Sequence, residues 1–278
     1  MNPARGLRTL PIYALLLLIA LLTLGPFLWS LSTSLRGQGE NIYALPAPLF
    51  PQHPTLGNFF RLTRELPSPG LWRFFGNSLG LAVLDTTLVL LFSTPMAYAL
   101  ARLRFPGRDL ILTLVLVTLL VPGAVQIIPW FLTIQKLGLY NTYLGVALPG
   151  AVTAFSIFLL RQGFAAIPNE LEEAGRIDGA SEWQTFWRIM LPLARPVLAT
   201  LVIFNFVASL NNFLWPLIVL EDRDLFTLPL GLSYLQSHFS FDQRLITAGA
   251  VLATVPSVVI YLLFQREFVR GLEGAVKG

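Results

Sequence analysis

The sequence of 278 residues contains no cysteine and few charged residues. Without cysteine, it can form neither a disulfide framework nor a thiolate metal or redox site. Charged residues make up 12% of the chain, whereas an average soluble domain has roughly 25%. Hydrophobic residues make up 55%. Because a soluble fold would expose far more charge, this composition indicates a membrane protein.

Several signatures of chemistry are also missing. The chain has no GxxxxGK[ST] motif, so it lacks the usual phosphate cradle for ATP. It has no HExxH, and its GxSxG match, GNSLG at residues 76–80, lies in an apolar predicted span and not at a strand-to-helix turn, which argues against an intramembrane enzyme. The two histidines, His53 and His238, lie far apart in predicted loops, and the net charge of +4 is small. We therefore expect no enzyme activity, no cofactor or metal bound by this chain, and no nucleic-acid partner.

Six apolar segments are long enough to cross a bilayer, which takes roughly 20 residues of helix. The first could instead be a signal peptide, but its apolar run is long and no small-residue cleavage site follows, so we expect an uncleaved anchor. The sequence thus predicts an all-α polytopic membrane protein in which residues 1–278 form a single transmembrane domain. The predicted spans are residues 10–35, 75–101, 110–132, 144–164, 197–220 and 245–264.

The distribution of arginine and lysine predicts the orientation of the chain. If the N-terminus is cytoplasmic, twelve of the 19 basic residues fall in cytoplasmic segments. Short cytoplasmic loops of membrane proteins carry such an excess. We therefore expect both termini, and the loop of residues 165–195, to be cytoplasmic.

The segment PNELEEAGRIDGASEWQTFWRIMLP, residues 168–192, is unusually polar for this chain. Its opening proline and the glutamates that follow suit the first turns of a helix. Gly179 can take the left-handed conformation that ends a helix. Ser181 and Gln184 then form a capping box for a second helix, which Pro192 is expected to end. The pattern predicts two short helices joined by a tight turn.

The second of these helices carries an apolar stripe, because Trp183, Phe186, Trp187 and Met190 have helical spacing. Such a stripe could lie on the bilayer surface, pack on the bundle or dock on a partner protein. The first helix favours docking, since three glutamates are unfavourable against anionic lipid. A small turn flanked by acids suits insertion into a groove of another protein.

These residues resemble the EAA loop of permease subunits in bacterial ATP-binding-cassette importers. The resemblance rests on EEAGRIDGASEWQTFWRIMLP at 172–192, and its spelling is similar to the carbohydrate branch, the maltose-type second permease subunit. Further segments are similar to the fifth span, the last loop and the sixth span of that family: FLWPLIVL at 213–220, TLPLGL at 227–232, and residues 247–272.

The resemblance implies an inner-membrane permease with six spans and a cytoplasmic coupling helix. It also implies three kinds of partner: a second permease subunit, an ATPase dimer that holds ATP and Mg²⁺, and an extracytoplasmic solute-binding protein. The implied docking residues are Glu173, Ala174, Gly175, Asp178 and Gly179. Gly175 replaces the family's alanine, and a glycine inside a helix costs about 1 kcal/mol relative to alanine. We expect it to loosen the helix while keeping the residue small.

Polar residues inside spans often mark a solute pathway. Asn205, Ser209 and Asn212 share one face of the fifth predicted span, and Asp85 is the one acid well within a span. These residues could line a pore, or they could bond other helices, including an arginine of a partner subunit.

Three aromatic residues, Trp130, Phe213 and Trp215, could stack on sugar rings, although anchoring at the membrane interface is the commoner role.

The predicted function is ATP-driven import of a sugar or sugar-like solute by alternating access, as the resemblance implies. A gradient-driven secondary transporter is one alternative. That class usually shows internal repeats and several intramembrane ionisable groups, whereas we find one such acid and no clear repeat. An ATP-driven importer of a polyol or of glycerol phosphate is the other alternative, and it stays open.

Overall fold

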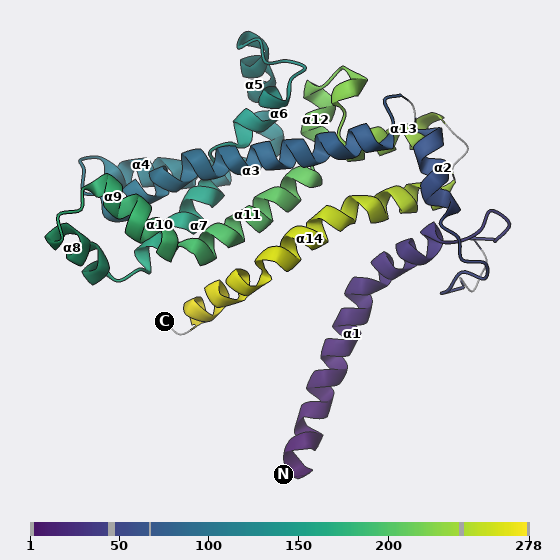
Figure 1. Ribbon diagram of the computed structural model, residues 1–278, viewed down its shortest axis with the longest axis horizontal. Helices are drawn as coiled ribbons and strands as arrows, with labels where there is room; N and C mark the ends of the chain where they lie inside the picture. The colour runs from purple at the N-terminus through teal and green to yellow at the C-terminus, as the bar shows by residue number, and fades with distance from the viewer. Residues whose placement is uncertain (1–2, 44–47, 67, 239–241, 277–278) are drawn as a thin grey trace. The chain divides into compact units, whose positions relative to one another are not determined.

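In the computed structural model, the regular elements of the described residues are all helices, as the sequence predicts (Figure 1). The orientation of the termini across the membrane stays a prediction. The structure describes residues 3–43, 48–66, 68–238 and 242–276.

The chain divides into two compact units. The first unit comprises residues 1–72 and 231–255, and the second comprises residues 73–230 and 256–278. The long helix α14 (Gln243–Val276) contributes to both, and so does α13 (Leu228–His238).

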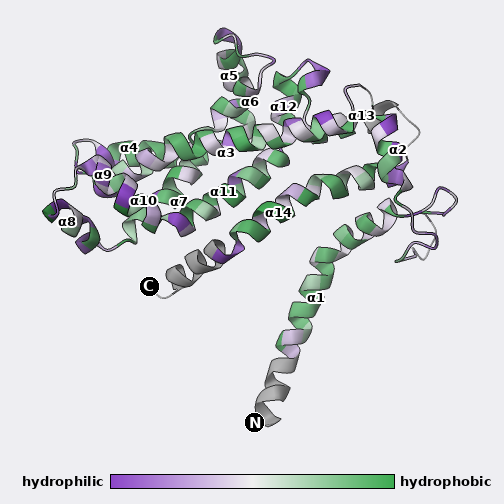
Figure 2. Ribbon diagram, in the orientation of Figure 1, coloured by the Kyte–Doolittle hydropathy of each residue, from purple (hydrophilic) through white to green (hydrophobic). Residues whose placement is uncertain are grey.

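In the first unit, α1 (Pro3–Ser34) is a long apolar helix. Its membrane-length stretch, Pro11–Ser34, has no buried residue before Ser32, and most of it is coloured as hydrophobic (Figure 2). A helix with this much uncovered apolar surface suits a lipid environment. Beyond its end, the buried side chain of Arg36 donates to the carbonyl of Pro48.

The short helix α2 (Gly57–Glu65) follows. The side-chain amide of Asn58 donates to the carbonyls of Ser34 and Arg36, both at 2.8 Å. Because Asn58 is buried, these bonds hold α2 against the end of α1. An ion pair of 2.9 Å between Arg61 and Asp242 joins α2 to the start of α14.

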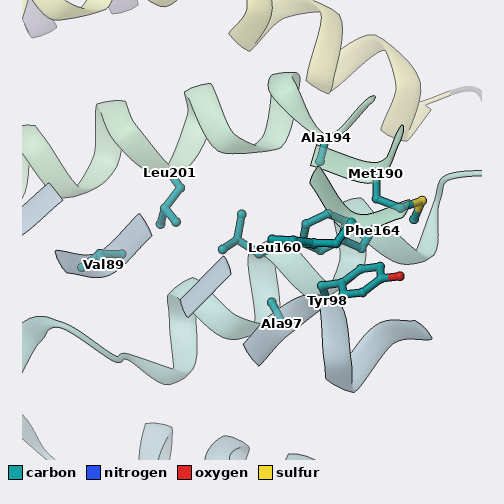
Figure 3. Close-up of a cluster of buried hydrophobic side chains, with 9 residues drawn as sticks. Val89, Ala97, Tyr98, Leu160, Phe164, Met190, Ala194 and Leu201 are labelled. Carbon is teal, nitrogen blue, oxygen red and sulfur yellow. The ribbon is translucent and has the colours of Figure 1, made fainter. Parts of the chain in front are cut away.

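The second unit is built around α3 (Leu71–Arg102), α7 (Ala154–Ala165) and α11 (Arg195–Leu210). These three helices and the segment 186–194 share a core of buried side chains (Figure 3). The ring of Tyr98 packs on those of Phe164 and Phe186 at centroid distances of 5.6 and 5.0 Å. This core fixes α3 against the C-terminal part of residues 165–195, the predicted docking loop. Its members are Val89, Ala97, Tyr98, Leu160, Phe164, Phe186, Met190, Ala194 and Leu201.

The remaining helices of this unit are short. They are α4 (Arg108–Val117), α5 (Gly123–Lys136), α6 (Tyr143–Ala147), α8 (Asn169–Ile177), α9 (Glu182–Thr185), α10 (Leu191–Leu193) and α12 (Leu214–Val219).

Within the described residues, three helices are long and apolar enough to cross a membrane. Three helix pairs would also qualify if each is one bent span, with bends of 108°, 51° and 73°. The chain therefore has three candidate spans, or up to six, by length and composition. The three continuous ones are Pro11–Ser34, Leu71–Arg102 and Gln243–Arg266, and the pairs cover residues 108–136, 143–165 and 182–210.

The predicted segments 110–132, 144–164 and 197–220 are each interrupted in the structure, which the apolar pattern did not show. Pro122 stands before α5 in an extended conformation, as expected where a proline removes the N–H. The Thr153 hydroxyl accepts the amide of Ser156 at 3.1 Å and so starts α7 afresh. The third interruption lies at residues 211–213, where the Asn211 side chain bonds the last turn of α11.

Pro192 does not end the second helix of the docking loop, contrary to the prediction. The helix continues to Leu193, and the chain bends by 73° before α11. The preceding residues, Phe186–Met190, form a π turn. Wider i→i+5 bonding moves the carbonyls that a proline ring would otherwise meet, so the proline is accommodated here.

Candidate functional site

The docking loop adopts the local structure predicted from its sequence. Gly179 has φ of +83° and ends α8 in the left-handed conformation. The Ser181 hydroxyl accepts the amide of Gln184 at 3.3 Å, and the Gln184 side chain accepts the amide of Ser181 at 2.9 Å. This is the complete capping box, and it opens α9 two residues after the turn.

Helix α8 has an exposed face that combines acids with apolar side chains. The predicted docking residues Glu173, Ala174, Asp178 and Gly179 are all exposed. Leu171 and Ile177, which the sequence analysis did not single out, are also exposed, Ile177 to 86%. The sequence could have indicated both, because they are large apolar residues in a stretch otherwise rich in acids. An uncovered apolar side chain beside charges is typical of a binding surface.

The fifth predicted docking residue, Gly175, lies on the opposite, buried face of α8. A Cβ placed there would lie 2.4 Å from Cδ1 of Ile189. The expectation that Gly175 merely loosens the helix is therefore incomplete, because this glycine lets α8 approach the π turn closely.

Exchanging Gly175 for alanine should reveal this contact in a double-mutant cycle. In the wild-type background, the higher helix propensity of alanine adds about 1 kcal/mol to the free energy of unfolding, but the cost of displacing Ile189 offsets this gain. In the Ile189→Val background, which lacks Cδ1, Gly175→Ala should raise the free energy of unfolding by about 1 kcal/mol more. Thermal unfolding of the purified protein measures both effects. Additive effects of the two substitutions would contradict the contact.

The apolar stripe of the second helix is divided between two environments. Phe186 is 3% exposed and Met190 is fully buried in the core, whereas Trp183 and Trp187 are 65% and 49% exposed. The stripe therefore packs on the bundle through half of its members. The two tryptophans remain available to a membrane interface or a partner.

The acid at position 172 was missed by the sequence analysis, and the structure places it at the base of the loop. Glu172 is buried, whereas its neighbour Glu173 is exposed. The Tyr98 hydroxyl donates to its carboxylate at 3.2 Å, and guanidinium nitrogens of Arg176 and Arg102 lie at 3.3 and 3.8 Å. Glu172 and Gly175 are three residues apart and share one helix face, and this spacing could have indicated that Glu172 faces inward.

The four predicted pathway residues meet at one cavity of about 340 Å³. Asp85 reaches it from α3, Asn205 and Ser209 from α11, and Asn212 from the turn after α11. The turn, rather than a continued helix, thus presents Asn212. Thr153, at the start of α7, adds a hydroxyl to the same wall.

The polar atoms of this cavity bond partly to one another. The Ser209 hydroxyl donates to Oδ2 of Asp85, and the Asn205 amide donates to the hydroxyl of Thr86 at 3.4 Å. Oδ1 of Asp85 is buried and has no hydrogen-bond partner within the described chain. The two readings of the polar stripe are therefore compatible, because residues that join α3 to α11 also line the cavity.

Two tryptophans form part of the apolar wall of the cavity. The rings of Trp130 and Trp215 pack edge to face with centroids 5.8 Å apart. The indole N–H of Trp215 donates to the carbonyl of Val146 at 3.1 Å, which fixes its ring. Phe213, the third aromatic residue considered, is not part of this wall. Within the described residues, no group of three or more acids or histidines could hold a metal ion.

Comparison with known proteins agrees with the resemblance noted from the docking loop. Residues 90–274 match the family described as binding-protein-dependent transport system inner membrane component. The chain is 41% identical over 249 residues to the arabinooligosaccharides transport system permease protein AraQ of Halalkalibacterium halodurans, covering 89% of this chain and 86% of that protein. It is 35% identical over 246 residues to the sn-glycerol-3-phosphate transport system permease protein UgpE of Escherichia coli O1:K1, covering 86% of each.

The fold is similar to that of a chain in the crystal structure of a bacterial ABC transporter involved in the import of the acidic polysaccharide alginate. The TM-score is 0.79 at 25% identity, and the match covers 96% of this chain and 99% of that chain. The family match spans most of the described second unit and includes both the docking loop and the residues of the cavity wall other than Asp85. This chain therefore belongs to the inner-membrane components of binding-protein-dependent transport systems, the permease subunits of ABC importers.

Proposed function

We propose that this chain is a permease subunit that imports a neutral oligosaccharide across the bacterial cytoplasmic membrane. It acts with a second permease subunit, an ATPase dimer that holds ATP and Mg²⁺, and an extracytoplasmic solute-binding protein. Residues 1–278 form one transmembrane domain of six spans, with both termini and the docking loop in the cytoplasm. The family and the oligosaccharide-transporting relative support this assignment.

The observation that carries the proposal is the exposed face of α8. It presents Glu173 and Asp178 together with the apolar side chains of Leu171 and Ile177. Glutamates facing anionic lipid would be repelled, which disfavours a position flat on the bilayer. A short helix with mixed acidic and apolar contacts suits a groove with a basic rim on the ATPase.

The docking loop converts closure of the ATPase dimer into movement of the spans. ATP binding draws the two ATPase subunits together, and the loop docked on each of them follows. The spans then open outward and receive the solute from the binding protein, and ATP hydrolysis resets them. Because this chain lacks a phosphate-binding loop, its contribution is to dock, to move and to hold the solute.

The cavity at Asp85 supports a neutral, hydroxyl-rich solute. The carboxylate of Asp85, which lines the cavity, can accept a hydrogen bond from a sugar hydroxyl, and the amides of Asn205 and Asn212 can donate and accept. The faces of Trp130 and Trp215 offer apolar surface to the C–H face of a ring.

The alternative solutes differ in charge. Neither lysine nor arginine lines the described cavity, and a carboxylate in its wall repels phosphate and uronate groups. This charge pattern disfavours glycerol phosphate, the solute in the name of one relative. A neutral polyol remains the second candidate. A gradient-driven mechanism is disfavoured by membership of a binding-protein-dependent family.

Purification of the tagged chain from native membranes tests the proposal. In mild detergent, we expect an ATPase and a second permease subunit to co-purify with the chain. ATP hydrolysis by this complex should rise when a sugar-loaded binding protein is added. A membrane protein of unrelated family, tagged and purified in the same way, is the control. Recovery of the chain without an ATPase would contradict the importer assignment.

A further inference from the structure

Glu172 forms a buried polar link between the docking loop and α3. Its side chain is only 7% exposed, although α8 is a short surface helix. A carboxylate is rarely buried unless it is paired, because removing its charge from water carries a large penalty. The groups that pair with it therefore determine where α8 sits.

Two of these groups come from one end of α3. The hydroxyl of Tyr98 donates to Oε1 of Glu172 at 3.2 Å, and Nε of Arg102 lies 3.8 Å from Oε2. Tyr98 and Arg102 are four residues apart, so both lie on the same face of α3. The ring of Tyr98 is packed in the buried core with that of Phe164 (Figure 3).

Arg102 also holds the chain on the N-terminal side of α8. One of its terminal nitrogens donates to the carbonyl of Phe164 at 2.7 Å and to that of Ile167. The other donates to the side chain of Asn169. The side chain is 6% exposed. A single arginine of α3 thus ties the end of α7, the start of α8 and, through Glu172, the middle of α8.

The other route from α8 into the bundle is less regular. It passes through the π turn at Phe186–Met190 and then bends by 73° before α11. In contrast, α3 is one continuous helix from Leu71 to Arg102, although Pro95 inside it removes one backbone hydrogen bond. Asp85 lies thirteen residues before Tyr98, about 20 Å along the helix axis at 1.5 Å per residue.

We propose that Glu172 is a positioning residue that makes α8 and α3 move as one body. Movement imposed on α8 by the ATPase then displaces the part of α3 that carries Asp85 in the wall of the cavity. The proposal rests on the proposed function, since it specifies how the docking loop acts on the solute site. Glu172 itself contacts neither the ATPase nor the solute in this scheme.

The test uses the complete complex with its partner permease, ATPase dimer and binding protein in proteoliposomes. Glu172→Gln keeps the shape of the side chain and removes its charge. We expect the complex to assemble and the ratio of stimulated to basal ATP hydrolysis to fall about tenfold. Glu170→Gln, the same exchange at an exposed position of α8, should keep the wild-type ratio.

A distance measurement separates a rigid link from a general loss of stability. Because the chain has no cysteine, spin labels can be placed at Glu170→Cys and Leu91→Cys, both exposed in this chain, within otherwise cysteine-free subunits. In the wild-type background, we expect one narrow distance that stays the same when ATP binds. In the Glu172→Gln background, the distribution should broaden.

Different results would overturn different statements. If the wild-type complex is stimulated and Glu172→Gln is stimulated equally, the positioning role is wrong while the proposed function stands. A wild-type distance that changes on ATP binding would also overturn it. A wild-type complex without any stimulation overturns the proposed function and this inference with it. Should Glu172→Gln fail to assemble, Tyr98→Phe removes only one hydroxyl, and the ratio should then fall about threefold.

Discussion

Solute uptake should fall about 100-fold when Glu173→Lys and Gly179→Asp are combined, because the ATPase no longer docks. Glu173 is exposed on the docking face, and reversing its charge opposes a basic rim. Loss of a close charge pair at an interface costs about 2–5 kcal/mol, and each 1.4 kcal/mol is about tenfold in affinity. Gly179 has φ of +83°, where any side chain adds strain.

Uptake of labelled solute by whole cells, together with recovery of the ATPase on the tagged chain, measures this effect. The second permease subunit should still be recovered, since the spans are unchanged. Glu221→Lys with Gly138→Asp is the matched control, because Glu221 is exposed and Gly138 also has a positive φ of +69°, outside the docking loop. This control should retain the ATPase. Unchanged uptake by the docking-loop variant would exclude docking through these residues.

Asp85→Asn should lower the uptake of a neutral oligosaccharide about tenfold without loss of assembly. The exchange keeps the shape of the side chain but removes a charged acceptor at the cavity, where Oδ1 has no partner in the described chain. A hydrogen bond to a charged group contributes about 1.5–3 kcal/mol. Because the repelling charge is lost, an anionic solute such as glycerol phosphate should be excluded less strongly.

Transport by proteoliposomes, with the neutral and the anionic solute each supplied on a matching binding protein, measures both effects. Asp109→Asn makes the same chemical change at an exposed position near the start of α4 and should transport as the wild type does. Wild-type uptake by Asp85→Asn would show that this carboxylate does not face the solute. Dissociation of the second permease subunit would instead indicate that Asp85 pairs with an arginine of that subunit.

Features that depend on a few neighbouring residues were predictable from the sequence. The turn at Gly179 and the capping box of Ser181 and Gln184 are encoded within four or five positions, and both occur in the structure as expected. The all-helical character of the described chain was likewise readable, because composition and apolar runs already exclude a soluble fold. The family was identified from the same local motif.

Helix continuity was less predictable. The apolar segments indicated which parts of the chain can be buried in lipid. They did not indicate the interruptions at Pro122, Thr153 and residues 211–213. The continuation through Pro192 was also missed. In each case, hydrogen bonds to neighbouring groups decide whether a helix breaks, and hydropathy does not measure them.

The sequence by itself determined that this chain is an apolar helical protein with an acidic, turn-containing loop and the signature of an importer permease. Only the tertiary structure decided the direction in which adjacent residues of that loop face. Glu172 turns inward to Tyr98 and Arg102, whereas Glu173 turns outward, and Gly175 meets Ile189. The tertiary structure likewise brought Asp85 to the polar residues of α11. The physical reason is that burial and pairing depend on side chains distant in the sequence, such as Tyr98, 74 positions from Glu172, which no local pattern contains.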